Sequence, residues 1–417
     1  MAGLRGGGSS LPGLVVEKID RDFAVRLLAK LPLGVVVISG TNGKTTTTRI
    51  VRDLLTSAGL RVFTNDSGSN FMRGVISSLL RVLSLSGRLE ADIAVLELDE
   101  AHAVDFARRV RPRQTLLLNV MRDQLDRFGE IDHTAELLAE VARNTTGAVV
   151  LNREDRRVAA IAASGLNARV HWYGLAPDLH HHFPEDDELY ASDDIAANAV
   201  DEPSSCPLSP DVVLAALDGS RATFQIAGVS HSTELALKGV YNAFNAAGAL
   251  ALARVVLAAP ATTDIQLVAA LARVTSAFGR GEEFLLGATS VELLLVKNPG
   301  GFRLALESFS PQGQVTMIAI NDDYADGRDM SWLYDVSFAS LRTSGVAMVS
   351  GTRAYDMALR LHYDEVPFAA VQTDSQRALA LFLADRSESP HRIYCTYTAM
   401  LALRRRLAAQ TDAEKVM

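Results

Sequence analysis

Short apolar runs alternate along this chain with longer stretches in which apolar residues recur at helical spacing. The runs are rich in Val, Ile and Leu, which is typical of strands buried on both faces of a sheet. In the first part of the chain the predicted strands are 34–39, 61–65, 92–98, 114–120 and 147–152. Because predicted helices separate these strands, the pattern indicates an α/β domain whose parallel sheet is covered on both faces.

Several segments depart from this alternation. Residues 14–31 have a mostly apolar helical face and predict a packing arm. Residues 171–211 are rich in Asp, Ser, Pro and His and have little periodicity, so we expect an inserted loop. The stretch 212–228 is typical of a β-hairpin, and an Ala-rich helix is expected from about residue 241 to residue 258.

A second α/β unit is expected near the C-terminus, with strands at 290–296, 315–320 and 345–351. A chain of 417 residues is too long for one ordinary core, which agrees with two domains. The predicted parts are an N-terminal helical arm (1–33), a central α/β domain (34–288, with 171–211 as a shortened insertion) and a C-terminal α/β domain (289–417).

Composition narrows the class of protein. With 48% hydrophobic and 22% charged residues the chain is globular, and its net charge of −8 disfavours nucleic acid as a partner. Its two cysteines, Cys206 and Cys395, cannot form a disulfide framework and are typical of a reducing compartment. No apolar stretch has the length of a membrane span, and residues 1–12 lack the apolar core of a signal peptide, so we expect a cytoplasmic protein.

The strongest chemical signal is the sequence ISGTNGKTTTT at 38–48, which lies between a predicted strand and a predicted helix. That context is the one a phosphate-binding loop requires. Gly40 and Gly43 let backbone N–H groups approach phosphate oxygens, Lys44 supplies a positive charge, and the Thr45 hydroxyl can bind Mg²⁺. Ile38 replaces the first glycine of the usual spacing. The alternative interpretation is a tight turn with a surface lysine.

GTNGKTT resembles the phosphate loop of the Mur ligase superfamily. The resemblance implies ATP and Mg²⁺ as cofactors, with Thr45 and Glu97 as metal ligands, since Glu97 in VLELDE matches the acidic position of these ligases. The alternative for Glu97 is a solvated strand end, and Asp99 and Glu100 are weaker candidates. The resemblance assigns the loop contacts with the nucleotide to Gly40, Thr41, Asn42, Gly43, Lys44, Thr45 and Thr46.

Three further segments resemble Mur ligases. GVYNAFNAAGA at 239–249 places Asn242 at the position that meets adenine, although a helix cap is the alternative. FGRGEEF at 278–284 places Arg280 at the position that approaches the phosphates, although a loop charge is the alternative. In RDQLDRFGEID at 122–132, Gln124 stands where many relatives carry a histidine, so a role in binding a second metal is left open. Its polar neighbours are Asp123, Asp126 and Arg127.

The C-terminal domain indicates which family of the Mur ligase superfamily the chain resembles. Its segments KNPGGF (297–302) and NDDYADGRDMSWLYDVSF (321–338) resemble the MurT family. Since the phosphate loop already occurs at residue 40, we expect no UDP-sugar-binding domain of the kind that begins the stem-peptide ligases. The MurT resemblance implies ATP-dependent amidation of the D-glutamate α-carboxyl of lipid II to D-isoglutamine through an acyl phosphate. It also implies a GatD-type glutaminase partner in a heterodimer or larger complex, and action at the inner face of the cell membrane.

The resemblance assigns Asp329, the second Asp of DGRD, to the Cys–His site of the glutaminase partner. A carboxylate that accepts a hydrogen bond from histidine fixes its tautomer and stabilises the imidazolium. The alternative is that Asp329 caps the helix expected from Met330. Asp326 and Asp335 are competing acids in the same segment.

MurT proteins commonly carry a four-cysteine zinc ribbon in the middle domain, and this chain departs from that pattern. The matching stretch retains only Cys206, together with the adjacent histidines His180, His181 and His182. A closed structural zinc site needs four ligands at suitable spacing. We therefore expect no structural zinc.

Two other functions fit parts of the sequence. A stand-alone amino-acid ligase of the same superfamily, similar to folylpolyglutamate synthase, would share the phosphate loop and work without a glutaminase. A non-catalytic ATP-binding scaffold is the other alternative, but intact Lys44, Thr45 and Glu97 count against it.

Overall fold

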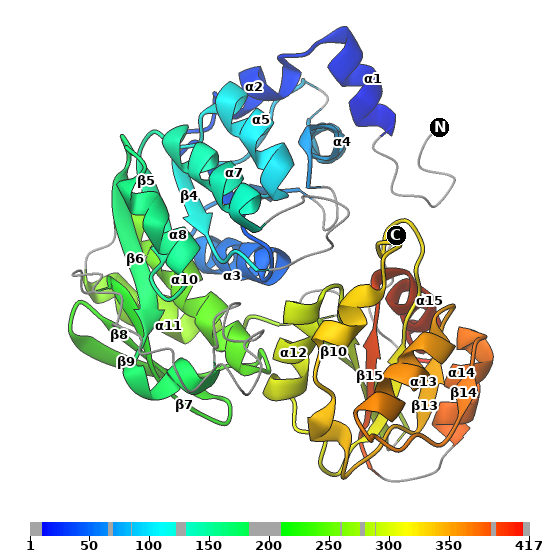
Figure 1. Cartoon of the computed structure of the whole chain (residues 1–417). Helices are drawn as coiled ribbons and strands as arrows, with labels where there is room; N and C mark the ends of the chain where they lie inside the picture. The colour runs from blue at the N-terminus through cyan, green and yellow to red at the C-terminus, as the bar shows by residue number, and fades with distance from the viewer. Residues whose placement is uncertain are drawn as a thin grey trace. The chain divides into compact units, whose positions relative to one another are not determined.

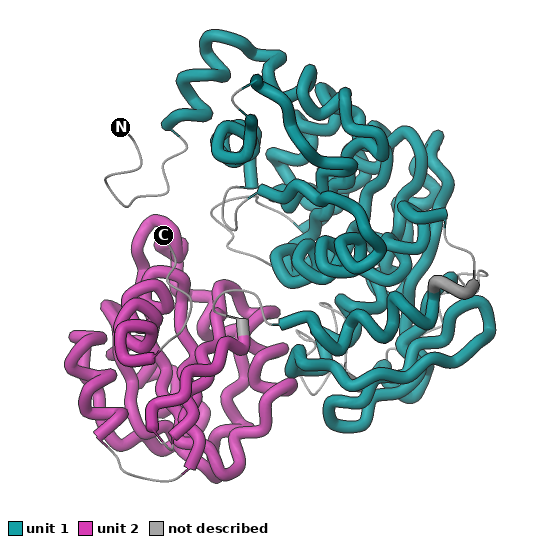
Figure 2. Tube along the Cα trace, turned by 180° about the vertical axis from the view of Figure 1, so that it is seen from behind, with its two compact units in different colours: residues 1–121, 130–275 teal, residues 122–129, 276–417 magenta. Residues whose placement is uncertain are grey.

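The computed structural model describes residues 11–65, 70–84, 86–121, 131–182, 210–258, 261–275, 280–287, 289–384 and 389–411 (Figure 1). These residues form two compact units, unit 1 up to Thr275 and unit 2 from Arg280 onward (Figure 2). Each unit is built on its own sheet. The predicted α/β class, with two α/β domains, is confirmed.

Unit 1 contains a nine-stranded sheet in the order β2-β3-β1-β4-β5-β6-β7-β8-β9. Its strands are parallel from β2 to β7, and β8 is antiparallel to both of its neighbours, β7 and β9. The strands are β1 (Val35–Ser39), β2 (Val62–Thr64), β3 (Ile93–Glu97), β4 (Gln114–Leu117), β5 (Ala148–Asn152), β6 (Arg169–Leu175), β7 (Val212–Asp218), β8 (Arg221–Ile226) and β9 (Val229–Glu234).

Helices cover both faces of this sheet, as Figure 1 shows. They are α1 (Leu11–Ile19), α2 (Phe23–Leu28), α3 (Lys44–Ser57), α4 (Met72–Val82), α5 (Glu100–Val110), α7 (Ile131–Arg143), α8 (Arg156–Ala160), α10 (Val240–Leu257) and α11 (Ala261–Leu271). In β1, Val36 and Ile38 pack into a core with α3 and α10, whereas Val35 and Val37 pack into a core with α4 and α5. Since successive side chains of a strand face opposite sides, a doubly covered strand needs an unbroken apolar run.

The Ala-rich helix is confirmed as α10, and it belongs to the core. By length and composition alone its 18 residues meet the requirements of a membrane span, but 61% of them are buried inside unit 1. The helix packs against α3, β6 and β7, and the ring of Phe244 lies 5.0 Å from that of Tyr173. Its apolarity is therefore explained by burial.

Two predictions for unit 1 need correction. The arm expected as one helix at 14–31 forms α1 and α2, because Asp20 accepts hydrogen bonds from the Asp22 N–H (3.2 Å) and from Arg26 (2.9 Å), which compete with helical bonding. The expected loop 171–211 begins with most of β6, a strand that pairs with β5 and β7 and contains the buried Trp172. The hairpin expected at 212–228 is confirmed as β7 and β8.

Unit 2 contains a six-stranded sheet in the order β10-β11-β15-β12-β13-β14, in which only β10 is antiparallel to its neighbour. The strands are β10 (Arg280–Leu286), β11 (Thr289–Leu295), β12 (Val315–Ala319), β13 (Met348–Ser350), β14 (Val371–Gln372) and β15 (His391–Cys395). The helices are α12 (Pro299–Ser308), α13 (Ala354–Tyr363), α14 (Ser375–Ala384), α15 (Tyr397–Ala408) and the 3₁₀ turns η4 (Ser331–Asp335) and η5 (Ala339–Leu341). One face packs on α12 and α13, the other on α14 and α15.

The three strands predicted for the second unit are confirmed as β11, β12 and β13. The expected boundary at residues 288/289 differs from the structure, because β10 forms a hairpin with β11 and so belongs to unit 2. Gly287, next to the expected boundary, lies in the turn between β10 and β11. The central strand β15 escaped prediction, since it opens with His391 and Arg392, whose burial the sequence does not reveal.

Candidate active site

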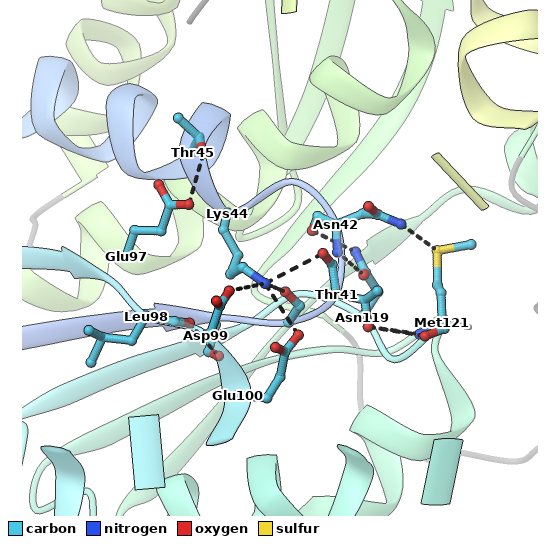
Figure 3. Close-up of polar contacts among 12 residues, drawn as sticks. Thr41, Asn42, Lys44, Thr45, Glu97, Leu98, Asp99, Glu100, Asn119 and Met121 are labelled. Carbon is cyan, nitrogen blue, oxygen red and sulfur yellow. Dashed lines mark hydrogen bonds and ion pairs between the residues drawn. The ribbon is translucent and has the colours of Figure 1, made fainter. Parts of the chain in front are cut away.

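The phosphate loop lies where β1 ends and α3 begins, at the carboxyl edge of the unit 1 sheet (Figure 3). Gly40 and Gly43 have φ of 133° and 88°, a region that side chains rarely adopt. A Cβ on Gly43 would lie 2.7 Å from Oδ1 of Asn245 in α10, so a side chain at this position would displace the Asn245 amide. No side chain caps α3 at Gly43. The loop thus presents backbone and a helix N-terminus, which together suit a phosphate.

Lys44 is 5% exposed and is held by oxygens from two directions. Its Nζ donates to the Gly40 carbonyl (2.6 Å) and lies 3.3 Å from Oδ1 of Asp99 and 3.3 Å from Oε1 of Glu100 (Figure 3). Glu100 is 3% exposed and begins α5, which follows β3. The two acids that the sequence ranks as weaker candidates therefore contact the loop lysine directly.

Thr45 and Glu97 form the second contact of the site. The Thr45 hydroxyl donates to Oε1 of Glu97 over 2.8 Å, and Glu97 is the last residue of β3. Asn65, which follows β2, brackets the Glu97 backbone, because its Nδ2 donates to the Glu97 carbonyl (2.8 Å) and its Oδ1 accepts from the Glu97 N–H (2.9 Å). A hydroxyl and a carboxylate are hard oxygen donors, so the pair fits Mg²⁺, which takes its other ligands from water and phosphate.

Asn119 closes the other side of the loop, and the sequence interpretation missed it. Its Oδ1 accepts from the Asn42 N–H (2.8 Å), its Nδ2 donates to the Asn42 carbonyl (3.1 Å), and its own carbonyl accepts from the Thr41 N–H (3.0 Å). Thr41 also bonds through its hydroxyl to the N–H of Met121 (3.1 Å). A polar residue just after β4, the neighbour of β1, is the signal that would have found Asn119.

Buried polar groups support the segment that carries Asn119. Asp155 accepts from the Val120 N–H (2.7 Å), and both Asn152 (2.8 Å) and the Tyr173 hydroxyl (3.2 Å) donate to the Leu118 carbonyl. Burial raises the pKa of Asp155, against the opposing effect of the backbone N–H groups that it accepts from. Burial likewise raises the pKa of Tyr173. The loop after β4 is therefore held in place from behind.

Asn242, the residue predicted to meet the base, lies in the first turn of α10. Asn242 is partly exposed, and its Nδ2 donates to the Lys238 carbonyl (2.6 Å). The N-cap of α10 is Gly239, and no side chain caps the helix there. A hollow of about 130 Å³ is lined in part by Leu217, Leu235, Lys238 and Gly239, and Asn242 is not among its lining residues. Asn245, one turn later, lies against Gly43 of the phosphate loop.

Other predicted residues fall elsewhere. Arg280 begins β10 of unit 2. Gln124 and Cys206 lie outside the described residues, as do Asp123, Asp126 and Arg127. Across the described ranges, no group of three or more His, Cys, Asp or Glu side chains is arranged to hold a metal ion.

Asp329 lies in unit 2, in the loop after β12, and is exposed. Its Oδ1 accepts from the Ser331 N–H (2.9 Å), a hydrogen bond that lowers its pKa and supplies the local capping contact of the alternative interpretation. Asp326, by contrast, is 1% exposed and bonded to Thr398. Asp335 is half-buried. Asp329 is therefore the only exposed one of the three candidate acids.

Two protein families match the chain. The Mur ligase middle domain matches residues 38–253, and the MurT ligase C-terminal domain matches residues 295–400. The chain is 31% identical to the lipid II isoglutaminyl synthase (glutamine-hydrolyzing) subunit MurT of Streptococcus pneumoniae, in an alignment that covers 99% of this chain and 95% of that protein. It is 29% identical to the MurT subunit of Staphylococcus aureus strain COL, over 89% of this chain and 87% of that one.

Solved structures share the fold. MurF from Acinetobacter baumannii gives a TM-score of 0.69 at 18% identity, covering 94% of this chain and 80% of its own. MurF from Thermotoga maritima in complex with ADP gives 0.68 at 16% identity, covering 96% and 85%. Folylpolyglutamate synthase from Mycobacterium tuberculosis, complexed with ADP and AMPPCP, gives 0.62 at 17% identity, covering 96% and 99%.

Proposed function

Because the chain belongs to the MurT family of Mur-type ligases, we propose that it is the ATP-using subunit of a lipid II isoglutaminyl synthase. The proposed reaction amidates the α-carboxyl of D-glutamate in the stem peptide of lipid II, giving D-isoglutamine. The main support for the proposal is that two features occur in one chain. The phosphate loop is intact, with Lys44 and the Thr45–Glu97 pair, and the same chain has the MurT C-terminal domain. A scaffold that only binds would not need this set of groups.

The chemistry explains why these groups are needed. A carboxylate is a poor electrophile and its oxide is a poor leaving group, so the carboxylate must first become an acyl phosphate, with release of ADP. Ammonia then attacks the acyl carbon, and phosphate leaves. Lys44 would place a positive charge beside the β- and γ-phosphates, and Thr45 and Glu97 would hold a Mg²⁺ ion, which when bound would offset charge during phosphoryl transfer.

For the rest of the nucleotide site, the proposed contacts are residues 40–46 with the phosphates, Asn242 with adenine and Arg280 with the phosphates. Support for the position of adenine comes from α10. Its Asn245 lies against Gly43, so Asn242, one turn earlier on the same helix, is close to the loop.

The source of ammonia requires a partner. At neutral pH dissolved ammonia is mostly protonated to ammonium, and ammonium is not nucleophilic. The proposed complex therefore includes a GatD-type glutaminase that releases ammonia from glutamine. Asp329 is the proposed third member of the Cys–His site of that partner, and its exposure leaves it accessible to a group from another chain. The complex is expected to work in the cytoplasm, at the inner face of the membrane that carries lipid II.

The test compares two nitrogen donors. Asp329→Asn keeps the size of the side chain but removes its charge, and loss of such a carboxylate can cost on the order of 10⁴ in rate. Glutamine hydrolysis by the complex should collapse, while ATP binding persists and added ammonium restores part of the lipid II amidation. Asp323→Asn is the matched control, because Asp323 is an exposed acid in the same loop.

Three outcomes separate the alternatives. If the Asp329→Asn complex still forms but loses amidation equally with glutamine and with ammonium, Asp329 belongs to the synthetase reaction. If the variant keeps amidation with both donors, Asp329 has no role in the glutaminase site. Amidation by wild-type chain without any glutaminase, with an amino acid in place of ammonia, would favour the stand-alone ligase.

A further inference from the structure

The turn that leads to Asp329 is fastened to the N-terminus of α15. This helix begins at Tyr397 with Thr396 as N-cap, but the Thr396 side chain does not cap it. Its hydroxyl instead accepts from the Asn321 N–H (2.9 Å), at the start of the turn. One end of the turn is thus tied to the residue that would otherwise cap the helix.

Asp326, at the other end of the turn, supplies the missing cap. Its Oδ1 accepts from the Thr398 N–H (2.8 Å), in the first turn of α15, and its Oδ2 accepts from the Thr398 hydroxyl. The same hydroxyl accepts from Nδ2 of Asn321 (3.0 Å). Thr398 therefore joins both ends of the turn 321–326 to a single helix N-terminus.

The geometry leaves the turn little freedom. Asp326 is 1% exposed, and a buried carboxylate is strongly disfavoured unless donors surround it. Here the Asp326 carboxylate accepts hydrogen bonds from a backbone N–H and a hydroxyl, and it lies at the positive end of a helix dipole. If Asp326 moved away, both the carboxylate and the start of α15 would lose these partners, so the contact fixes the position of the loop.

A second anchor follows Asp329. Arg360 of α13 donates from Nη2 to the Val336 carbonyl (2.7 Å) and from Nε to the Leu333 carbonyl (3.1 Å), and its Nη1 bonds Asp364 (2.7 Å). These bonds fix η4, which begins two residues after Asp329. Asp329 thus projects from a short stretch of chain that is held at both ends by buried polar groups.

We propose that the Asp326–Thr398 contact is the positioning element of Asp329, so that Thr398 is a positioning residue of the glutaminase reaction. The inference rests on the proposed function, because it needs Asp329 to act on the partner. A catalytic carboxylate must hold its histidine in one orientation, and a displacement of about 1 Å can cost about 10²-fold in rate. A local contact that restrains the loop therefore has a direct kinetic consequence.

The test uses the full complex and three variants of this chain. Thr398→Val keeps the shape but removes the hydroxyl, and Thr398→Ser restores it. Thr316→Val is the control, because Thr316 is 2% exposed in β12 and its hydroxyl has no hydrogen-bond partner among the described residues. Glutamine hydrolysis, ammonium-dependent amidation, complex formation and the midpoint of thermal unfolding are measured for each variant.

Thr398→Val should lower kcat for glutamine hydrolysis about 10- to 100-fold, with KM for glutamine unchanged within twofold and ammonium-dependent amidation retained. Thr398→Ser should recover most of the loss, and Thr316→Val should behave as wild type. Normal glutamine turnover in Thr398→Val would overturn the inference, and so would an equal loss with both donors. A wild-type complex that amidates with neither donor would instead refute the proposed function, which keeps the two failures apart.

Discussion

The Thr45 hydroxyl lies 2.8 Å from a carboxylate oxygen of Glu97, so the first turn of α3 and the end of β3 share one polar contact. The Glu97 backbone is in turn bonded on both sides by the Asn65 amide. Since β3 is the neighbour of β1, the sheet itself sets the separation of the two oxygens. A pair held in this way can receive Mg²⁺ with little rearrangement.

Thr45→Val should therefore weaken metal-dependent turnover by about 10- to 100-fold and raise the Mg²⁺ concentration needed for half-maximal rate. Thr47→Val is a matched control on the same helix, because the Thr47 hydroxyl is buried and has no hydrogen-bond partner among the described residues. Titrating Mg²⁺ at saturating ATP checks both variants. An unchanged Mg²⁺ requirement in Thr45→Val would remove this residue from the metal site.

Lys44 is expected to be essential for turnover and also to stabilise the fold. Lys44→Met should abolish ATP-dependent amidation, and it leaves the buried Glu100 without its cation, which costs about 3–5 kcal/mol in such pairs. Adding Glu100→Gln removes the uncompensated charge, so the double variant should regain most of its stability but none of its turnover. Urea unfolding and ATP turnover separate the two effects. Normal turnover in either variant contradicts the assignment of Lys44.

The sequence predicts those elements whose pattern agrees with their burial. Strand β1 is a run of five buried residues, and the sequence predicts its position. The sequence does not predict β15, because this strand begins with His391 and Arg392. Nothing in the sequence shows that Arg392 pairs with Glu292 of β11 over 2.8 Å. A charged residue in the centre of a sheet depends on a partner about a hundred positions away.

The residues of the candidate site likewise fall into those that the sequence could predict and those that it could not. Lys44, Thr45 and Glu97 could be proposed from motif spacing, because the motif carries the local geometry. Asn65 and Asn119 could not, since their contacts depend on strand order, which places β2 beside β3 and β4 beside β1. The predicted role of Asp329 is tested by the comparison of nitrogen donors described above, and the roles of Asn242 and Arg280 stay predictions.

No structural zinc is expected, and elemental analysis decides the matter. The family resemblance implies a four-cysteine zinc ribbon in the middle domain, but the matching segment of this chain has Cys206 as its single cysteine, whereas a closed site needs four ligands. Tag-free protein should contain well under one zinc per chain, and a chelator should leave the unfolding midpoint unchanged. One tightly held zinc per chain would contradict the prediction.

The pH dependence of stability offers a test of the support behind Asn119. Burial raises the pKa of Asp155, so the folded chain binds this proton more tightly than the unfolded chain, whose Asp pKa is about 3.9. The stability contributed by Asp155 is therefore full below that value and declines as pH rises through the folded pKa. Asp155→Asn lacks this titration. Its destabilisation relative to wild type should be largest in acid and should shrink toward neutral pH.

Asp92 gives a control of opposite sign. The Arg61 guanidinium, 2.8 Å away, lowers the pKa of Asp92, so the stability it contributes is present above the unfolded pKa and is lost as pH falls. Destabilisation by Asp92→Asn should therefore grow from acid to neutral pH, while that by Asp155→Asn shrinks. Unfolding by urea at several pH values measures both differences on the same scale. If the Asp155→Asn difference also grows with pH, the hydrogen bonds from Val120 and Val158 outweigh burial, and Asp155 supports the loop as a carboxylate rather than as an acid.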